Sequence, residues 1–305
     1  MFPDIGTGTW CALFGFSRQA YYKHTDHSDF AVQCIREMIL QSARSIREKM
    51  PRIGSRKLFL MIQKELGNEP AFPGRDKFLE ILASEGLLLK VRRRKRYKTT
   101  DSNHPYQRYP NLIRGRVFDA PDQAWASDIT YVETAEGVCY LSLITDLYSR
   151  KIVGWALGPT LEAIYCMKAL QMALDSLPAS QIAAGLIHHS DRGCQYCCHD
   201  YVGLLKSRGI QISMTENGDP LENAVAERVN GILKNEWLCV REIKTRAECL
   251  IRIEQAVESY NNARPHMSLG YQTPAAAHGQ SGLQKRCWKT FAERKAQEAS
   301  VPACS

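Results

Sequence analysis

Three acidic residues, Asp128, Asp191 and Glu227, stand where metal-dependent chemistry on phosphate esters would need them. Asp128 lies in the segment WASDITY, Asp191 ends an apolar run, and Glu227 belongs to a helix-like stretch. Thirty-five residues separate Asp191 from Glu227. Carboxylates brought together from separate elements supply the oxygen ligands that hard divalent cations prefer. A pair of such cations can activate a nucleophile and stabilise the leaving oxygen in phosphoryl transfer.

Each acid also has a purely structural interpretation. An acidic residue is disfavoured inside a strand, so Asp128 indicates either metal binding or an exposed strand face. Asp191 follows a predicted strand, where α/β sheets usually bind ligands, but an Asp before Arg-Gly is also typical of a turn. Glu227 alone would suit a solvated charged face. The three acids therefore argue for a site only when they are taken together.

The helix that carries Glu227 has a predicted start at 219–222, where an Asp caps, a Pro follows and a Glu reaches back. Those capping roles leave Glu227 as the free acid of this helix. Residues seven apart differ by about 20° around a helix, so Glu227, Asn230 and Lys234 share one stripe. A carboxylate two turns before a lysine can hold a metal ion at one end and a DNA phosphate at the other.

Residues 1–90 predict an all-helical, helix-turn-helix-like region. A short helix capped by Ser17 would carry Arg18. Hydrophobic spacing predicts three more helices, at 30–48, 54–66 and 74–85. Basic side chains such as Arg56 are expected on the outer faces of these helices. A DNA-binding unit has this character, although a helical bundle with no nucleic-acid partner can carry similar charges.

The positive charge of the chain is concentrated in its first 120 residues, which hold 22 Lys/Arg and 12 Asp/Glu, or +10, against −2 for the remainder. Residues 91–120 are predicted to be a basic linker with little periodicity. Their clustered cations suit contact with a phosphate backbone, and a solvated hinge is the alternative. The cluster comprises Arg92, Arg93, Arg94, Lys95 and Arg96.

Residues 121–280 predict a mixed α/β sheet flanked by helices. Three strands with short links come first, at 129–132, 138–144 and 151–157. Helices and strands then alternate: helix 160–177, strand 186–189, helix 199–208, strand 210–214, and helices 220–238 and 245–262. Three antiparallel strands followed by alternating elements indicate helices on the faces of one sheet. Residues 281–305 are predicted to be a tail.

The sequence favours a cytoplasmic protein. It opens with no signal peptide, no stretch approaches the roughly 20 apolar residues of a membrane span, and its eleven cysteines form no regular framework. Cys194, Cys197 and Cys198 resemble half a zinc site, but no second pair stands at a suitable distance. Packed or idle thiols are the simpler interpretation.

Several motifs together resemble one family. They are WASDITY around Asp128, DLYSR from Asp146, HHSDRGCQY around Asp191, NAVAE ending at Glu227, KNE from Lys234, and YNNARPH with the later Thr-Pro. The chain resembles transposases of the insertion-sequence-three group, and more narrowly the product of their second reading frame. These belong to the retroviral-integrase superfamily. The resemblance is strong over about 120–280 and looser over 10–90.

The resemblance implies a ribonuclease-H-like core that binds two Mg²⁺ ions, or Mn²⁺, through Asp128, Asp191 and Glu227. It implies cleavage at transposon ends, transfer of the freed 3′-hydroxyl to another phosphodiester, and double-stranded DNA as the partner, both as terminal inverted repeats and as target. Action as a homo-oligomer and help from an upstream-frame protein are also implied. Lys234 matches the family's basic residue after the glutamate, and Arg192 is a further expected DNA contact.

Other interpretations stay open at this point. A ribonuclease-H-like nuclease would cut without joining, and a DNA-binding regulator would keep an inactive core. Asp146 is an acidic rival for the site, but in Asp-Leu-Tyr-Ser-Arg it is better suited to cap a hairpin turn. His188, His189 and His266 either shape the pocket or lie buried with hydrogen-bond partners.

Overall fold

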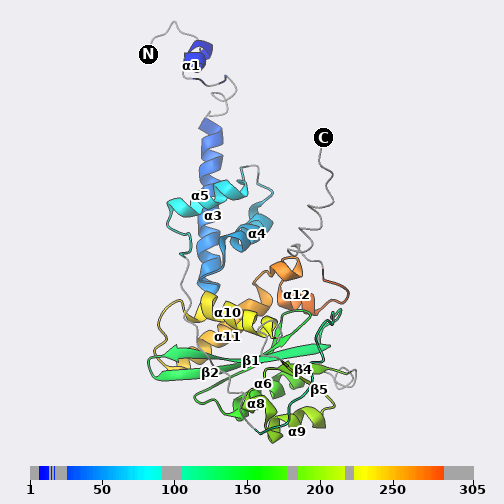
Figure 1. The fold of residues 1–305 in the computed structure, drawn as a ribbon. Coiled ribbons are helices and arrows are strands. Elements are labelled where there is room, and N and C mark those ends of the chain that lie inside the picture. The colour runs from blue at the N-terminus through cyan, green and yellow to red at the C-terminus, as the bar shows by residue number, and fades with distance from the viewer. Residues whose placement is uncertain are drawn as a thin grey trace, which may run out of the picture. The chain divides into compact units, whose positions relative to one another are not determined.

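The computed structural model describes residues 7–13, 15, 17, 26–69, 71–90, 105–177, 185–216 and 223–284. The chain divides into two compact units, Met1–Arg93 and Arg94–Ser305 (Figure 1). Each unit has its own buried core. The finer boundaries expected at 90, 120 and 280 stay predictions. In the described part of the chain, no helix has the length and apolar character that a membrane crossing needs.

The N-terminal unit is helical. It contains α1 (Thr7–Leu13), α3 (Asp26–Lys49), α4 (Ser55–Leu66) and α5 (Arg75–Ser84). The three longer helices agree with the predicted ones, and α3 begins four residues earlier than expected. The predicted helix capped by Ser17 falls largely outside the described residues. Apolar side chains at helical spacing fill the core of this unit: Ile39, Leu58, Ile62, Phe78 and Leu82.

The C-terminal unit is built on a five-stranded sheet with the order β3-β2-β1-β4-β5. The strands are β1 (Ala124–Thr134), β2 (Gly137–Asp146), β3 (Ile152–Gly158), β4 (Ile187–Ser190) and β5 (Gln211–Met214). β1, β2 and β3 form an antiparallel meander, whereas β4 and β5 run parallel to β1. The predicted mixed sheet is therefore confirmed, and β1 lies at its centre.

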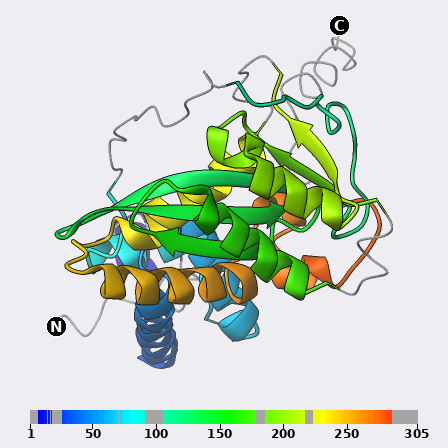
Figure 2. The same ribbon diagram turned by 90° about the horizontal axis from the view of Figure 1, so that it is seen from below.

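Helices cover both faces of this sheet (Figure 1). One face packs against α6 (Ala163–Asp175), α8 (Cys194–Cys197) and α9 (His199–Ser207) around Trp125. Figure 2 looks from below, where the green α6 and the yellow-green α9 lie over the strands. Gly154 permits close packing, since a Cβ there would lie 2.1 Å from the Ala169 carbonyl oxygen of α6.

The other face packs against α10 (Ala224–Leu233), which continues into the π-helix η1 (Lys234–Leu238). A single helix was expected over 220–238. The structure instead changes helix type at Lys234, and π-helical turns often occur at functional sites. The predicted capped start at 219–222 lies outside the described residues, and the described helix begins after Asn223.

The last elements close the edge and one end of the sheet. α11 (Arg246–Asn262) lies along edge strand β3, where the Asn261 side chain bonds both the N–H and the carbonyl of Ile152. The short helices η2 (Met267–Leu269) and α12 (Pro274–His278) follow. The sequence analysis missed α8, η2 and α12, because elements of three to five residues give too little periodicity to detect.

Candidate active site

The register between β1 and β4 leads directly to two of the three acids. These parallel strands pair at Ala124↔Ile187, Trp125↔His188 and Ala126↔His189. The ladder ends there, and the same offset carried two residues further would bring Asp128 opposite Asp191, the first residue after β4. Because side chains alternate along a strand, Asp128 belongs to the sheet face of Ala126, which α10 covers.

Helix α10 supplies Glu227 and is fastened to β1 at consecutive residues. Asn223 donates a hydrogen bond of 3.1 Å to the Ser127 carbonyl, and Asn230 donates one of 2.7 Å to Asp128 Oδ2. Apolar residues of the same helix, Val229, Ile232 and Leu233, are buried. Glu227 lies between the two asparagines and is exposed. The stripe predicted from helical spacing thus faces the strand that carries Asp128.

The electrostatics of the three acids show that they lie near one another. Burial, the charge of Asp191 and, less strongly, the charge of Glu227 together raise the pKa of Asp128 to about 7, against the hydrogen bond from Asn230. The pKa of Glu227 is also raised, first because nearby protein atoms partly desolvate the carboxyl of this exposed side chain and then by the charge of Asp191. Three acids that oppose one another's ionisation form a site whose ionised state a cation would stabilise.

Asp191 is held by a local turn. Its Oδ1 accepts a hydrogen bond of 3.0 Å from the Gly193 N–H, and a Cβ on Gly193 would lie 3.1 Å from the same oxygen. The turn interpretation of Asp191 is therefore confirmed. It does not compete with a role at the site, because the turn fixes a carboxylate that remains only partly buried.

Lys234 lies farther along the same stripe. Its Nζ donates to Thr130 Oγ1 at 3.2 Å and sits 4.1 Å from the ring centroid of Tyr131, a cation–π contact. Burial lowers its pKa, although nearby acids including Asp128 oppose the shift. The ammonium group therefore approaches the acidic site along β1.

Three of the other predicted DNA contacts lie in the described part of the chain. Arg56 is exposed on α4, and Arg192 is half-buried after Asp191. Asn230 is 4% exposed and donates a hydrogen bond to Asp128. The remaining ones lie outside the described residues: Arg18, Arg92, Arg93, Arg94, Lys95 and Arg96.

The histidines singled out from the sequence are buried, as their structural interpretation predicts. His188 and His189 contact Ser127 and Ser213, respectively, and His266 contacts Arg264. The cysteines between 194 and 198 remain free thiols. Within the described residues they join no group of metal ligands.

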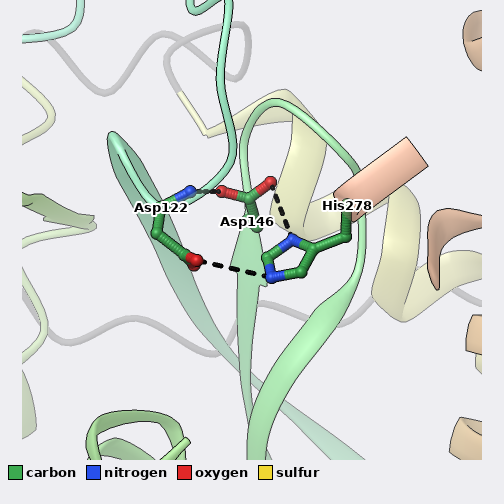
Figure 3. Close-up of side chains that lie close together, drawn as sticks. All are labelled: Asp122, Asp146 and His278. Atoms are coloured by element: carbon green, nitrogen blue, oxygen red, sulfur yellow. Dashed lines mark hydrogen bonds and ion pairs between the residues drawn. The ribbon is translucent and has the colours of Figure 1, made fainter. Parts of the chain in front are cut away.

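A second acidic group lies at the end of β2, and the sequence analysis identified only one of its members. Asp122, Asp146 and His278 form the one group of three in the described part of the chain whose ligand atoms all lie within 4.8 Å of one another. Figure 3 shows the His278 ring between the two carboxylates, with Nε2 3.4 Å from Asp122 and Nδ1 3.8 Å from Asp146. We call this the His278 cluster.

Hydrogen bonds in the His278 cluster satisfy its carboxylates. Asp146 accepts from the Asp122 N–H at 2.9 Å and from the N–H and hydroxyl of Ser149, each at 2.6 Å. Asp122 accepts from Trp125 Nε1 at 2.8 Å. The prediction that Asp146 caps a turn is confirmed. His278 could not be linked to it from sequence, because 131 residues separate the two.

The acids Asp128, Asp191 and Glu227 fit a divalent metal ion better than the His278 cluster does. Their donors are carboxylates from three elements, and the raised pKa of Asp128 reports crowded negative charge. Pairs of divalent ions about 3.5–4 Å apart, held by carboxylates, are the usual catalysts of such phosphoryl transfers.

Comparison with known proteins shows to which family the chain is similar. Two models of the integrase core domain match residues 119–220 and 208–274. A 31 kDa protein of insertion element IS600 from Shigella sonnei is 37% identical over 87% of this chain and 96% of its own length. The transposase of IS629 from the same species is 30% identical over 90% and 92%. The InsF transposase of IS3A from Escherichia coli K12 is 36% identical over 54% and 57%.

The sheet topology and the matched family models define a polynucleotidyl transferase with an integrase core, a ribonuclease-H-like catalytic domain. The chain belongs to the insertion-sequence transposases, in the group of insertion sequence three. It is thus a DDE-type enzyme of DNA transposition, and the family implies DNA binding and use of a divalent metal ion. The resemblance read from the sequence motifs is confirmed.

Proposed function

We propose that the C-terminal unit cuts DNA at transposon ends and joins the freed 3′-hydroxyl to a second phosphodiester, with Asp128, Asp191 and Glu227 as the catalytic acids. The observation that carries this proposal is the electrostatic coupling of these three acids, which come from β1, the end of β4 and α10. The family of the chain supports it. Both reactions are in-line phosphoryl transfers, and one site can perform them in turn.

Asp128, Asp191 and Glu227 would hold two Mg²⁺ ions, with Mn²⁺ as a substitute. Bound there, such ions activate the attacking oxygen and stabilise the leaving oxygen. Hydrogen bonds orient two of the carboxylates, from Asn230 to Asp128 and from the Gly193 N–H to Asp191. Because phosphoryl transfer depends on positioning and charge neutralisation, displaced acids would slow the reaction even if all of them remained present.

Two residues beside the acids have separate roles in this proposal. Asn230 orients Asp128, since its amide donates to Asp128 Oδ2 and its side chain is buried. That burial favours a positioning role over the DNA contact expected from the sequence. Lys234 is half-buried beside Tyr131 and is the better candidate for a DNA phosphate contact.

DNA would also bind outside the acidic site. Arg56 on α4 and Arg192 after Asp191 are candidate phosphate contacts, as are Arg18 and the cations at 92–96 from their sequence. We further propose double-stranded terminal repeats and target DNA as the substrates, a homo-oligomer on DNA, and an upstream-frame protein as a helper. The protein itself is expected to act in the cytoplasm, at the nucleoid.

A strand-transfer assay tests the proposal. Labelled duplex DNA that carries the terminal repeats flanking the gene is incubated with the protein and Mg²⁺ or Mn²⁺, and cleaved and joined products are separated. The wild-type protein should yield both products. Asp191→Ala should abolish both and leave DNA binding nearly intact, which a mobility-shift measurement would check.

The two rival functions give other results in the same assay. Cleavage without joined products, even from precut ends with a free 3′-hydroxyl, would indicate a nuclease. DNA binding with no metal-dependent nicking would indicate a regulator with an inactive core. Mg²⁺-dependent joining by Asp191→Ala would remove Asp191 from the catalytic role.

A further inference from the structure

Backbone pairing between β1 and β4 stops before it reaches the acids. The ladder has three residue pairs and ends at Ala126↔His189. Asp128 and Asp191 each lie two residues beyond that last pair. Their separation must therefore be fixed by contacts other than this ladder, and Ser127, which lies between Ala126 and Asp128, is the residue placed to do so.

The Ser127 hydroxyl links β1 to β4 and α9. Its Oγ lies 2.6 Å from Nε2 of His188, and the Tyr201 hydroxyl lies 2.9 Å from the same nitrogen. All three side chains are at most 1% exposed. Because side chains alternate along β1, this network lies on the sheet face opposite Asp128. It joins β1, which carries Asp128, to β4, which leads to Asp191.

The Ser127 carbonyl links β1 to the third catalytic element. It accepts a hydrogen bond of 3.1 Å from the Asn223 amide, which is buried at the start of α10. Asn223 precedes Glu227 by one helical turn. One residue next to Asp128 thus contacts the element that leads to Asp191 and the element that carries Glu227.

We propose that Ser127 is a positioning residue that sets the mutual spacing of the three acids for the metal pair, an inference that rests on the proposed function. Its hydroxyl controls the spacing of Asp128 and Asp191, and its carbonyl the approach of α10. A buried hydrogen-bonded junction can hold such a spacing closely, and an error of about 1 Å in an active site can cost about a hundredfold in rate.

The test compares Ser127→Ala with a matched control, Ser142→Ala. Ser142 is equally buried on β2, and its hydroxyl faces Cys166 of α6. Mn²⁺ binding to the full chain without DNA is measured by isothermal titration calorimetry. Ser127→Ala should raise the Kd for Mn²⁺ about tenfold, as expected for the loss of one well-placed hydrogen bond. Ser142→Ala should change it less than about twofold, and Ser127→Thr, which keeps the hydroxyl, should stay near the wild-type value.

The Mn²⁺ concentration for half-maximal nicking should shift in parallel with the Kd. Unchanged Mn²⁺ binding by a folded Ser127→Ala variant would overturn the positioning role. If that variant fails to fold, as judged by circular dichroism, Tyr201→Phe carries the test. It removes one hydroxyl from the network and should weaken Mn²⁺ binding about threefold; wild-type binding would again overturn the proposal.

Failure of this inference is distinguishable from failure of the proposed function. A wild-type protein that binds no Mn²⁺ and nicks no DNA contradicts the function itself. A wild-type protein that does both, with the Ser127 and Tyr201 variants unchanged, contradicts only the positioning role.

Discussion

Two groups of acids in the same domain differ in how their negative charge is compensated. One group is Asp128, Asp191 and Glu227, and the other is the His278 cluster. Asp128 and Asp146 lie on neighbouring strands, three residue pairs or about 10 Å apart along the β1–β2 ladder. In the His278 cluster an imidazole lies between two carboxylates and hydrogen bonds satisfy their oxygens. At the proposed catalytic site the two strongest electrostatic effects on Asp128 are burial and the charge of Asp191.

The pKa values record this difference. Burial alone would lower the pKa of His278, but its contacts with Asp122 and Asp146 outweigh burial and raise it to about 9. Burial would likewise raise the pKa of Asp122, yet His278 and Trp125 bring it below its usual value. Asp128 shifts the other way, to about 7. The His278 cluster contains its own cation, whereas Asp128, Asp191 and Glu227, the proposed catalytic acids, lie together without one and would need metal ions to neutralise their charge.

The largest effect should come from neutralising a catalytic acid. Asp128→Asn removes one metal ligand, so cleavage and joining should fall about a thousandfold or more. Stability should not fall, because a carboxyl whose pKa is raised by folding weakens the folded state once it ionises. Thermal melts at pH 8 should show an unchanged or higher Tm. A large drop in Tm would mean that Asp128 is structural and would break the comparison.

Removing a carboxylate from the His278 cluster should lower stability and leave Mn²⁺ binding unchanged, the reverse of Asp128→Asn. Asp146→Ala removes a fully buried carboxylate with three hydrogen-bond donors and leaves His278 without one of its partners. Breaking a buried ion pair in this way costs about 3–5 kcal/mol. Urea unfolding should show that loss, while Mn²⁺ affinity at low temperature, where the variant stays folded, should remain near wild type. Loss of Mn²⁺ binding with full stability would instead indicate a metal site at the His278 cluster.

The pH dependence of stability separates the two groups further. The pKa of His278 rises on folding from 6.5 to about 9, so its contribution is complete below pH 6.5 and is lost as the pH rises through 9. The shift corresponds to at most about 3 kcal/mol. Lys151 also acts on His278 and opposes its protonation. Urea unfolding of wild type between pH 6 and 9.5 should show the decline, and His278→Gln should flatten it. Parallel pH profiles for the two proteins would contradict a charged His278.

The three candidate acids could be singled out from sequence because each lies in a local pattern. Asp128 interrupts a strand, Asp191 ends one, and Glu227 follows from helical spacing. The sheet was predicted for the same reason, since its strands and α6, α9 and α11 have clear apolar periodicity. What sequence could not provide is pairing across the chain. Nothing near Asp122 indicates His278, and Ser127 and Asn223 show their roles only once β1, β4 and α10 are adjacent.

The Asn230 hydrogen bond should matter less than the acids themselves. Asn230→Ala removes the donor that lowers the pKa of Asp128, so the carboxyl should bind a proton more readily and metal less well. The Kd for Mn²⁺ at pH 7 should rise about tenfold. Asn235→Ala serves as the control, because the Asn235 amide donates to the Gly231 carbonyl one helical turn earlier. Equal effects of the two variants would show that helix stability, not Asp128, is responsible.

Replacing Lys234 should have the smallest effect. It tests whether the cation beside the acids binds DNA or neutralises the acids. Its ammonium group is near Asp128 but contacts Thr130 and Tyr131, so it does not neutralise the acids as His278 does. If it contacts one DNA phosphate, Lys234→Ala should lower the slope of log affinity against log salt by about 0.9, whatever the DNA sequence. Lys234→Arg should keep the slope. Fluorescence anisotropy with duplex DNA at several salt concentrations measures it. An unchanged slope with a higher Kd for Mn²⁺ would instead place Lys234 among the residues that support the metal site.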